Sequence, residues 1–210
     1  MKVYDSTDIR NVGLVGHLNA GKTSLAAGIL FTGGIGSRLT RVDEGNTITD
    51  FDEEEIARRI TIATSLAHVE WKKSKVNLLD TPGFNIFMND TKQALVAADA
   101  VLVLVDGVAG VEVQTEKVWH FAEEFKLPRA IVINKLDRER SSFERALDSI
   151  HGAIGRAAVP IHLPIGSERE FRGYVDLIAM KAYTYEPGGN GKGKESEIPD
   201  SLAGVAQKGH

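Results

Sequence analysis

Residues 12–23 read VGLVGHLNAGKT, and this stretch decides the fold. The apolar run 12–15 predicts a short buried strand, and Gly16–Thr23 matches the phosphate-loop pattern G-x-x-x-x-G-K-[ST]. A helix predicted over 22–30 follows directly. Glycines in such a loop let successive backbone N–H groups face phosphate oxygens, and the helix N-terminus adds partial positive charge. The pattern predicts a phosphate-binding loop, with an ordinary glycine-rich turn as the alternative.

Strand patterns alternate with helical patterns farther along the chain. The strand patterns lie at 61–71, 76–79, 100–105 and 129–133. The last two are apolar on both faces, which is typical of buried parallel strands, whereas 61–71 alternates as a strand near a sheet edge does. This order predicts an α/β fold, a three-layer, doubly wound architecture with a mostly parallel sheet.

Apolar residues also recur at helical spacing in two segments, 118–125 and 143–154. The spacing of Ser141 and Glu144 predicts a capping box at the start of the second helix. Beyond that helix, short strand-like runs predict a small β-rich unit. These runs are 174–178 and 182–185.

Composition and charge exclude several classes of protein. The 210 residues carry 25 Lys and Arg against 29 Asp and Glu, a net charge of −4. The sequence therefore lacks the excess of basic residues that would indicate unaided nucleic-acid binding. Hydrophobic residues at 42% and charged residues at 26% are typical of a soluble globular protein. The absence of cysteine excludes disulfides and thiolate metal sites, and it fits a reducing cytoplasm. The strongest apolar run, 100–105, is far shorter than the about 20 residues of a membrane helix.

A second motif, NKLD at 134–137, follows the strand predicted at 129–133. Ligands bind at the carboxyl ends of strands in open α/β sheets. An ionised Asp137 can accept hydrogen bonds from N1–H and the 2-amino group of guanine, which adenine lacks. A site whose buried polar group stays unpaired with the wrong ligand can favour the right ligand by a factor of as much as about 10⁴–10⁵. The motif predicts guanine rather than adenine; standing alone, such a tetrapeptide is more often a helix entrance.

A third motif, DTPG at 80–83, follows the strand predicted at 76–79. We expect Asp80 to hold Mg²⁺ through water and the Gly83 N–H to contact a γ-phosphate, while Lys22 reaches the β- and γ-phosphates and the Thr23 hydroxyl binds Mg²⁺. A plain strand-end turn is the alternative. In this order, the three motifs predict a GTP-binding switch and exclude an ATPase.

Three further segments carry a family resemblance. They read RRITI at 58–62, VAGVEVQTEKVW at 108–119 and PIGSEREFRGYVDLI at 164–178. With the phosphate loop, they resemble the translational GTPases, and within that class elongation factor G and its paralogues. The resemblance covers residues 8–200, and the third segment is similar to the start of a subdomain inserted into that factor's GTPase domain.

The resemblance implies a division of the chain. Residues 1–158 correspond to the GTP-binding domain, or G domain, with a P-loop NTPase fold. Residues 159–206 correspond to part of the inserted subdomain, truncated, and 207–210 are expected to be a tag remnant. In the family, a Gly-Ser-Ala segment after the insert contacts guanine O6, and nothing after Ile178 matches it. Because one base contact is worth about 1–3 kcal/mol, we expect nucleotide affinity to fall about 5- to 150-fold.

The resemblance also implies roles for individual residues. Contacts to the nucleotide are implied for Gly16, His17, Leu18, Asn19, Ala20, Gly21, Lys22, Thr23, Ser24, Asp80, Thr81, Pro82, Gly83, Phe84, Asn134, Lys135 and Asp137. Catalytic roles are implied for Lys22, Thr61 and Gly83. Metal contacts are implied for Thr23, Thr61 and Asp80. Leu18 and Ile60 match an apolar gate beside the attacking water. The implied cofactors are GTP or GDP with Mg²⁺, and the implied partner is the ribosome, through its RNA and through the parent protein. We expect a monomer without membrane contact.

Some positions depart from the family pattern. Phe84 stands where the family has a water-positioning histidine, which leaves about 3–5 kcal/mol of the barrier unaccounted for. His17 is the nearest substitute, and a structural loop residue is the alternative. Asn19 replaces an aspartate, although its side-chain carbonyl can still coordinate a monovalent cation. Arg59 replaces a glycine, which removes backbone freedom. The acidic run 50–55 is typical of a solvated helix face, and the resemblance assigns it to switch I, the segment ordered by a γ-phosphate.

Three interpretations of function follow. The first is an enzyme, the G domain of an elongation factor G-like translation factor that hydrolyses GTP to GDP and phosphate with Mg²⁺, weakly in isolation. The second is a slow or non-hydrolysing guanine-nucleotide-binding switch, because of Phe84. The third is a stretch without activity of its own, because the Gly-Ser-Ala segment is unmatched.

Calorimetric titration with GDP and Mg²⁺, and then with ATP, checks the guanine prediction. We expect GDP to bind with a Kd of about 1 μM or tighter and ATP not to bind, because only guanine offers two donors to Asp137. ATP binding as tight as that of GDP would contradict the prediction.

Overall fold

The structure, a computed structural model, describes residues 2–186, 189 and 191–210. The chain forms two compact units, one of Met1–Asp106 with Val111–Asn134 and the other of Gly107–Gly110 with Lys135–His210. The main break between these units therefore lies before Lys135. The division at 158/159 drawn from the sequence differs from it and stays a prediction.

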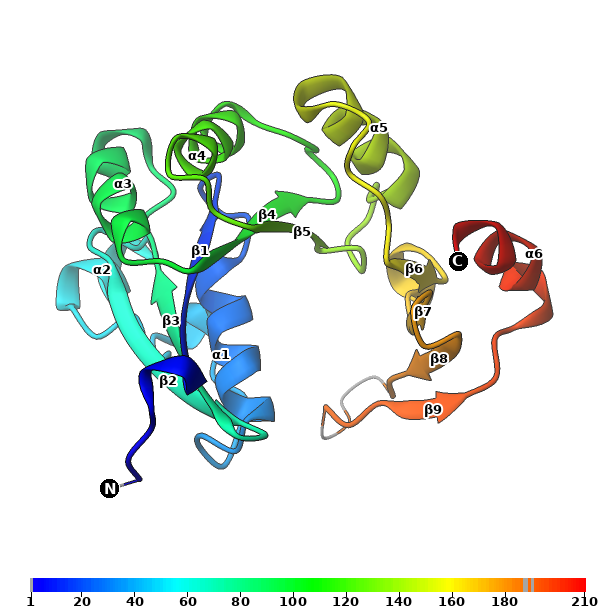
Figure 1. The fold of residues 1–210 in the computed structure, drawn as a ribbon, viewed down its shortest axis with the longest axis horizontal. Helices are drawn as coiled ribbons and strands as arrows, with labels where there is room; N and C mark the ends of the chain where they lie inside the picture. Colours follow the sequence, from blue (N-terminus) through cyan, green and yellow to red (C-terminus); the bar gives the residue numbers. More distant parts are fainter. Residues whose placement is uncertain (1, 187–188, 190) are drawn as a thin grey trace. The chain divides into compact units, whose positions relative to one another are not determined.

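The first unit is built on a five-stranded sheet with the order β2-β3-β1-β4-β5 (Figure 1). Its strands are β1 (Ile9–Gly16), β2 (Ser65–Trp71), β3 (Ser74–Asp80), β4 (Ala100–Asp106) and β5 (Arg129–Asn134). Strands β3, β1, β4 and β5 are parallel, and β2 pairs antiparallel to β3 at the edge. The mostly parallel sheet and the edge strand within 61–71 are thus confirmed.

The sequence motifs of this unit gather at the carboxyl edge of its parallel strands. Leu14 of β1 pairs with Asp80 of β3, and Asp106 of β4 pairs with Asn134 of β5. Gly16, Asp80 and Asn134 are each the last residue of a strand. The phosphate loop, the DTPG turn and the first residue of the NKLD motif therefore leave the sheet on the same side.

Helices cover both faces of this sheet (Figure 1). The helical elements are η1 (Ser6–Asp8), α1 (Lys22–Thr32), η2 (Val42–Glu44), α2 (Glu53–Arg58), η3 (Asn85–Phe87), α3 (Met88–Val96) and α4 (Val113–Glu124). One core packs Leu95 of α3 and Val118 of α4 with Val101 of β4, and the other packs Leu30 of α1 with Leu78 of β3. Leu79, the residue after Leu78 in β3, packs against the first core, and successive side chains of a strand point to opposite faces, so the two cores are separate layers. The three-layer α/β architecture is confirmed.

The second unit carries α5 and a four-stranded antiparallel sheet with the order β6-β7-β8-β9 (Figure 1). Its elements are α5 (Phe143–Ile154), β6 (His162–Ile165), η4 (Glu168–Glu170), β7 (Gly173–Asp176), β8 (Lys181–Thr184), β9 (Lys194–Ser196) and α6 (Asp200–Gly209). Ala206 of α6 joins Val175 and Ala182 in a small apolar core, so the predicted β-rich unit is confirmed. Residues 207–209 continue α6, and their origin as a tag remnant stays a prediction.

Within the described residues, no helix is both long and apolar enough to cross a membrane.

Helix α5 begins one residue later than the capping-box spacing predicts, so that prediction is wrong in register. Ser142 is the N-cap, and its Oγ accepts a hydrogen bond from the Arg145 backbone N–H at 3.2 Å. The hydroxyl of Ser141 instead donates to the Leu136 carbonyl at 2.8 Å. The sequence offers two adjacent serines, and the turn before the helix decides which one caps it.

Packing of α3 on the sheet predicts a clear contrast between two neighbouring substitutions. Leu95 is fully buried and Val96 is 70% exposed. We expect Leu95→Ala to lower the free energy of unfolding by about 2–5 kcal/mol, because it leaves a cavity under α3. The matched control Val96→Ala should stay within about 0.5 kcal/mol of the parent. Urea denaturation followed by circular dichroism measures both, and equal losses would contradict this packing.

Candidate functional site

Two glycines set the backbone path of the phosphate loop between β1 and α1. Gly16 has a φ of +149°, and a Cβ there would lie 2.6 Å from the Leu104 carbonyl oxygen. Gly21 is the N-cap of α1, with a φ of +98°. The side-chain amide of Asn134 donates to the Ala20 carbonyl at 2.9 Å, and a Cβ on Gly21 would lie 2.3 Å from the same amide nitrogen. Asn134 therefore braces the loop from the end of β5.

Lys22 is buried at the start of α1, with its ammonium folded back over the loop. Its Nζ donates to the His17 carbonyl at 2.9 Å and to the Gly16 carbonyl at 3.4 Å. The DTPG turn closes the other side, since a Cβ on Gly83 would lie 2.3 Å from this Nζ and 2.8 Å from the Leu18 backbone nitrogen. Only glycine at position 83 lets the two backbones approach around the ammonium group.

Two threonine hydroxyls meet beside Lys22. The Oγ1 atoms of Thr23 and Thr61 are 3.1 Å apart, and both residues are buried. Adjacent oxygen ligands of octahedral Mg²⁺, each about 2.1 Å from the metal, lie about 3 Å apart. The spacing of the two hydroxyls therefore fits adjacent positions around one Mg²⁺ ion.

Asp80 is the buried anion of this cluster. Its side chain is fully buried, and neither carboxylate oxygen has a hydrogen-bond partner of ordinary geometry among the residues that the structure describes. Burial raises the pKa of Asp80 from 3.8 to about 6, although the Thr23 and Thr49 hydroxyls and the Lys22 ammonium act in the opposite direction. Because a buried unpaired carboxylate is unfavourable, these residues fit a bound divalent cation.

Asp50 is a second buried carboxylate at the site, and sequence reasoning did not single it out. It is 4% exposed, its Oδ2 accepts from the Thr47 hydroxyl at 3.1 Å, and its Oδ1 has no partner among the described residues. Burial raises its pKa, and the nearby Glu55 carboxylate adds to the effect. The solvated helix face predicted over 50–55 is wrong for two of its residues. Asp50 lies before α2, which begins at Glu53, whereas Glu55 lies within α2 but is buried because its carboxylate accepts from backbone amides of residues 62 and 63. No helical periodicity could have signalled this burial.

The other residues of the DTPG turn have structural partners. The Thr81 hydroxyl donates to the Leu14 carbonyl at 2.7 Å, and the Pro82 carbonyl accepts from the Thr91 hydroxyl at 2.8 Å. These bonds tie the turn to β1 and α3. They hold Gly83 against the phosphate loop.

His17 and Phe84 differ in their surroundings. His17 Nε2 lies 3.4 Å from the Glu112 carboxylate, while its buried Nδ1 has no partner within the described part of the chain. Phe84 is 39% exposed, with its ring centroid 6.2 Å from that of Phe87. Phe84 presents no polar atom to a water molecule, and the ring of His17 is already directed to Glu112.

The remaining predicted positions are mostly at the surface. Asn19 and Ser24 are exposed, and Asn19 has a φ of +63°. Arg59 ends α2 in the same left-handed region, with a φ of +56°, which is the conformation that the family's glycine favours. Lys135 and Asp137 belong to the second unit, where Asp137 is exposed. The predicted contact of Asp137 with a base stays a prediction.

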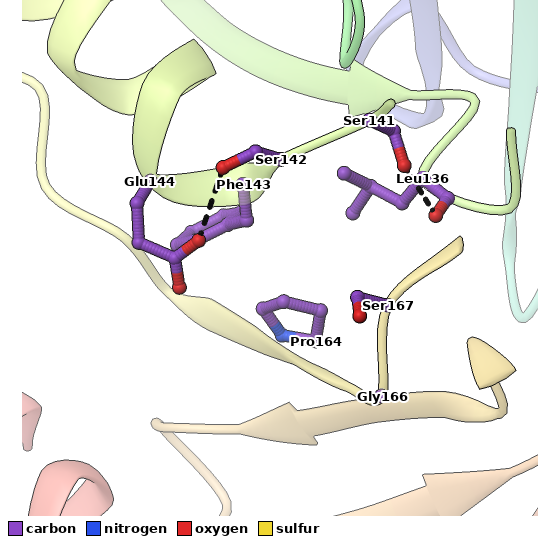
Figure 2. Close-up of a pocket in the computed structure, with 8 residues that line it drawn as sticks. All are labelled: Leu136, Ser141, Ser142, Phe143, Glu144, Pro164, Gly166 and Ser167. Carbon is purple, nitrogen blue, oxygen red and sulfur yellow. Dashed lines mark hydrogen bonds between the residues drawn. The ribbon is translucent and has the colours of Figure 1, made fainter. Parts of the chain in front are cut away.

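A hollow of about 390 Å³ lies in the second unit, at the start of α5 (Figure 2). It is lined by Leu136, Ser141, Ser142, Phe143, Glu144, Pro164, Gly166 and Ser167. The Ser141 hydroxyl bonds to the Leu136 carbonyl, and that of Ser142 caps α5. Because these groups already have partners, the hollow gives no ligand assignment.

A family model and individual relatives of this chain point to the same group of proteins. Residues 7–206 match the family model described as the elongation factor Tu GTP binding domain. The chain is similar to elongation factor G of Granulibacter bethesdensis, at 41% identity over 93% of this chain and 28% of that protein. It is similar to elongation factor G of Mycoplasma pneumoniae, at 39% identity over 96% of this chain and 29% of that protein.

A crystal structure from Thermus thermophilus is similar as well, with a TM-score of 0.88 and 37% identity over 97% of this chain and 30% of that one. The chain therefore spans less than a third of the length of these relatives.

The raised pKa of Asp80 predicts a pH-dependent stability difference in the metal-free protein. Folding disfavours the charged form, so the ionised carboxylate lowers stability above pH 6, and the penalty disappears below about pH 4. We expect Asp80→Asn to raise the free energy of unfolding by about 1–3 kcal/mol at pH 7.5, and by much less at pH 4. Urea unfolding of both proteins in a chelator buffer measures the difference. A variant that is less stable at pH 7.5, or a difference independent of pH, would contradict the assignment.

Proposed function

This chain belongs to the family of elongation factor Tu GTP-binding domains, and from that membership we propose that it binds GTP and GDP with Mg²⁺ and hydrolyses GTP. It does so as the G domain of an elongation factor G-like translation factor. One observation carries the proposal: the buried, unpartnered carboxylate of Asp80 stands at the end of β3 in a cluster with the Lys22 ammonium and the Thr23 hydroxyl.

The phosphates of the nucleotide are held by the loop Gly16–Thr23. Its backbone N–H groups and the N-terminus of α1 supply partial positive charge, and the Lys22 ammonium exchanges its loop carbonyls for phosphate oxygens. Asn134 keeps the loop in this shape through Ala20. Asp137 selects guanine by accepting from N1–H and the 2-amino group.

Thr23 and Thr61 would offer hydroxyl ligands to Mg²⁺, and the carboxylates of Asp80 and Asp50 would help to hold the ion. The 3.1 Å spacing of the threonine hydroxyls supports this arrangement. So do the two oxygens of Asp80 and the Oδ1 of Asp50, which have no hydrogen-bond partner of ordinary geometry among the described residues. When bound, Mg²⁺ supplies neutralisation of the charge that develops on the phosphates. A monovalent cation beside the exposed Asn19 is a further part of the proposal.

Hydrolysis requires a water molecule in line with the γ-phosphate. The backbones of Thr61 and Gly83 position this water, and Leu18 and Ile60 shield it from bulk solvent. Lys22 stabilises the negative charge that develops on the phosphoryl oxygens. Without a polar side chain at Phe84, the chain alone hydrolyses GTP slowly, and the ribosome is the proposed stimulating partner.

A second candidate is a guanine-nucleotide switch that hydrolyses GTP very slowly or not at all. The observation that favours it is that the Phe84 side chain offers no hydrogen bond, while the imidazole of His17, the substitute considered from the sequence, faces Glu112. Under this alternative, binding of GTP rather than its turnover controls the partner.

Phe84→His, compared with Phe84→Ala, tests the slow switch. A large rise in GTP turnover would favour the slow switch, and no rise would show that Phe84 does not limit the rate. If a missing water-positioning group limits the rate, we expect Phe84→His to raise single-turnover GTP hydrolysis with ribosomes by about 10²–10⁴-fold, whereas Phe84→Ala stays near the parent rate. Phe87→His, on the adjacent turn, is the matched control. Release of phosphate from GTP measures the rate.

Fast ribosome-stimulated hydrolysis by the parent chain would exclude the slow switch. Failure of the parent chain to bind GDP or GTP with Mg²⁺ would contradict both candidates.

A further inference from the structure

The loop of residues 60–64, which carries Thr61, is anchored by a buried carboxylate on α2. Glu55 is 3% exposed, and its Oε1 accepts hydrogen bonds from the backbone N–H groups of Ile62 at 2.7 Å and Ala63 at 3.2 Å. The Glu55 backbone carbonyl also accepts from the Ile60 N–H at 3.2 Å. One residue thus holds the loop on both sides of Thr61.

A second carboxylate holds the far end of the same loop. Asp90, in the first turn of α3, accepts from the Thr64 backbone N–H at 2.7 Å and also from the Thr64 hydroxyl. Hydrogen bonds to an ionised acceptor are stronger than neutral ones. The Thr61 loop is therefore fixed between α2, which belongs to switch I, and α3, which follows the DTPG turn.

This double anchoring determines where the Thr61 hydroxyl lies. With residues 60, 62, 63 and 64 tied through their amides, the loop turns Thr61 toward the start of α1, where its Oγ1 lies 3.1 Å from that of Thr23. Neither Glu55 nor Asp90 belongs to the motifs that contact nucleotide. Their hydrogen bonds reach the loop through the amides of the residues that flank Thr61.

We propose that Glu55 and Asp90 are positioning residues that set the preference for GTP over GDP by holding the Thr61 loop closed. The inference rests on the proposed function, because Thr61 matters through the metal shell of a bound triphosphate. A ligand that needs the closed loop binds with an apparent affinity reduced by the fraction of molecules that are closed. Under the proposed function, Thr61 would complete the metal shell only when a γ-phosphate is present, so the affinity for a diphosphate does not depend on closure.

The test compares nucleotide affinities of matched alanine variants. Glu55→Ala and Asp90→Ala remove the anchors, and the exposed neighbours Glu53→Ala and Asn89→Ala are controls on the same helices. Kd values for GDP and for a non-hydrolysable GTP analogue, each with Mg²⁺, are measured by fluorescence titration. We expect each anchor variant to weaken the GTP analogue by about 10- to 100-fold and GDP by less than about twofold.

A conservative variant separates positioning from simple destabilisation. Glu55→Gln keeps a carbonyl oxygen that can accept from both amides, so we expect it to recover most of the affinity for the GTP analogue. Limited trypsin digestion gives an independent readout, since Arg58 and Arg59 are exposed beside the loop. The GTP analogue should slow cleavage there in the parent and in Glu55→Gln, but not in Glu55→Ala.

Equal weakening of GDP and the GTP analogue, or anchor variants that match their controls, would overturn the positioning role. Absence of nucleotide binding in the parent chain would overturn the proposed function itself. Binding by the parent chain is therefore measured before any variant is compared. The two failures are therefore distinct.

Discussion

The buried carboxylate of Asp80 is the constraint on which the functional end of the first unit depends. It ends β3 without a hydrogen-bond partner of ordinary geometry among the described residues, and burial raises its pKa to about 6. An unpaired buried charge lowers stability, so such a group persists where a ligand compensates for it. Lys22 and Thr23 lie beside this charge, and the Thr61 hydroxyl lies next to that of Thr23.

Close backbone approach is the second requirement of this arrangement. Gly83 lies against the phosphate loop where any Cβ would collide with the Lys22 ammonium, and Gly16 passes the Leu104 carbonyl under the same restriction. Gly83 lets the turn after β3 approach the phosphate loop, and Gly16 lets the end of β1 lie close to β4. The carboxylates of Glu55 and Asp90 then fix the remaining part of the cluster, the loop that carries Thr61.

Much of the first unit could be predicted from its sequence because its signals are local. The strands β3, β4 and β5, the edge strand β2 and the helix after the phosphate loop lie where apolar patterns indicate them. The predictions failed where neighbouring residues compete or where burial comes from distant segments. Ser142 rather than Ser141 caps α5, and Asp50 and Glu55 are buried although their run is typical of a solvated helix face.

The sequence by itself determined the residue types of the site, because glycine spacing, a lysine before a threonine, and a strand-ending aspartate have meanings that do not depend on the rest of the chain. It also determined the family, through motifs that lie in one order. Only the tertiary structure decided which carboxylates are buried and which of them anchors Thr61. Those contacts join α2, the Thr61 loop and α3, and no periodic pattern along a single segment encodes them.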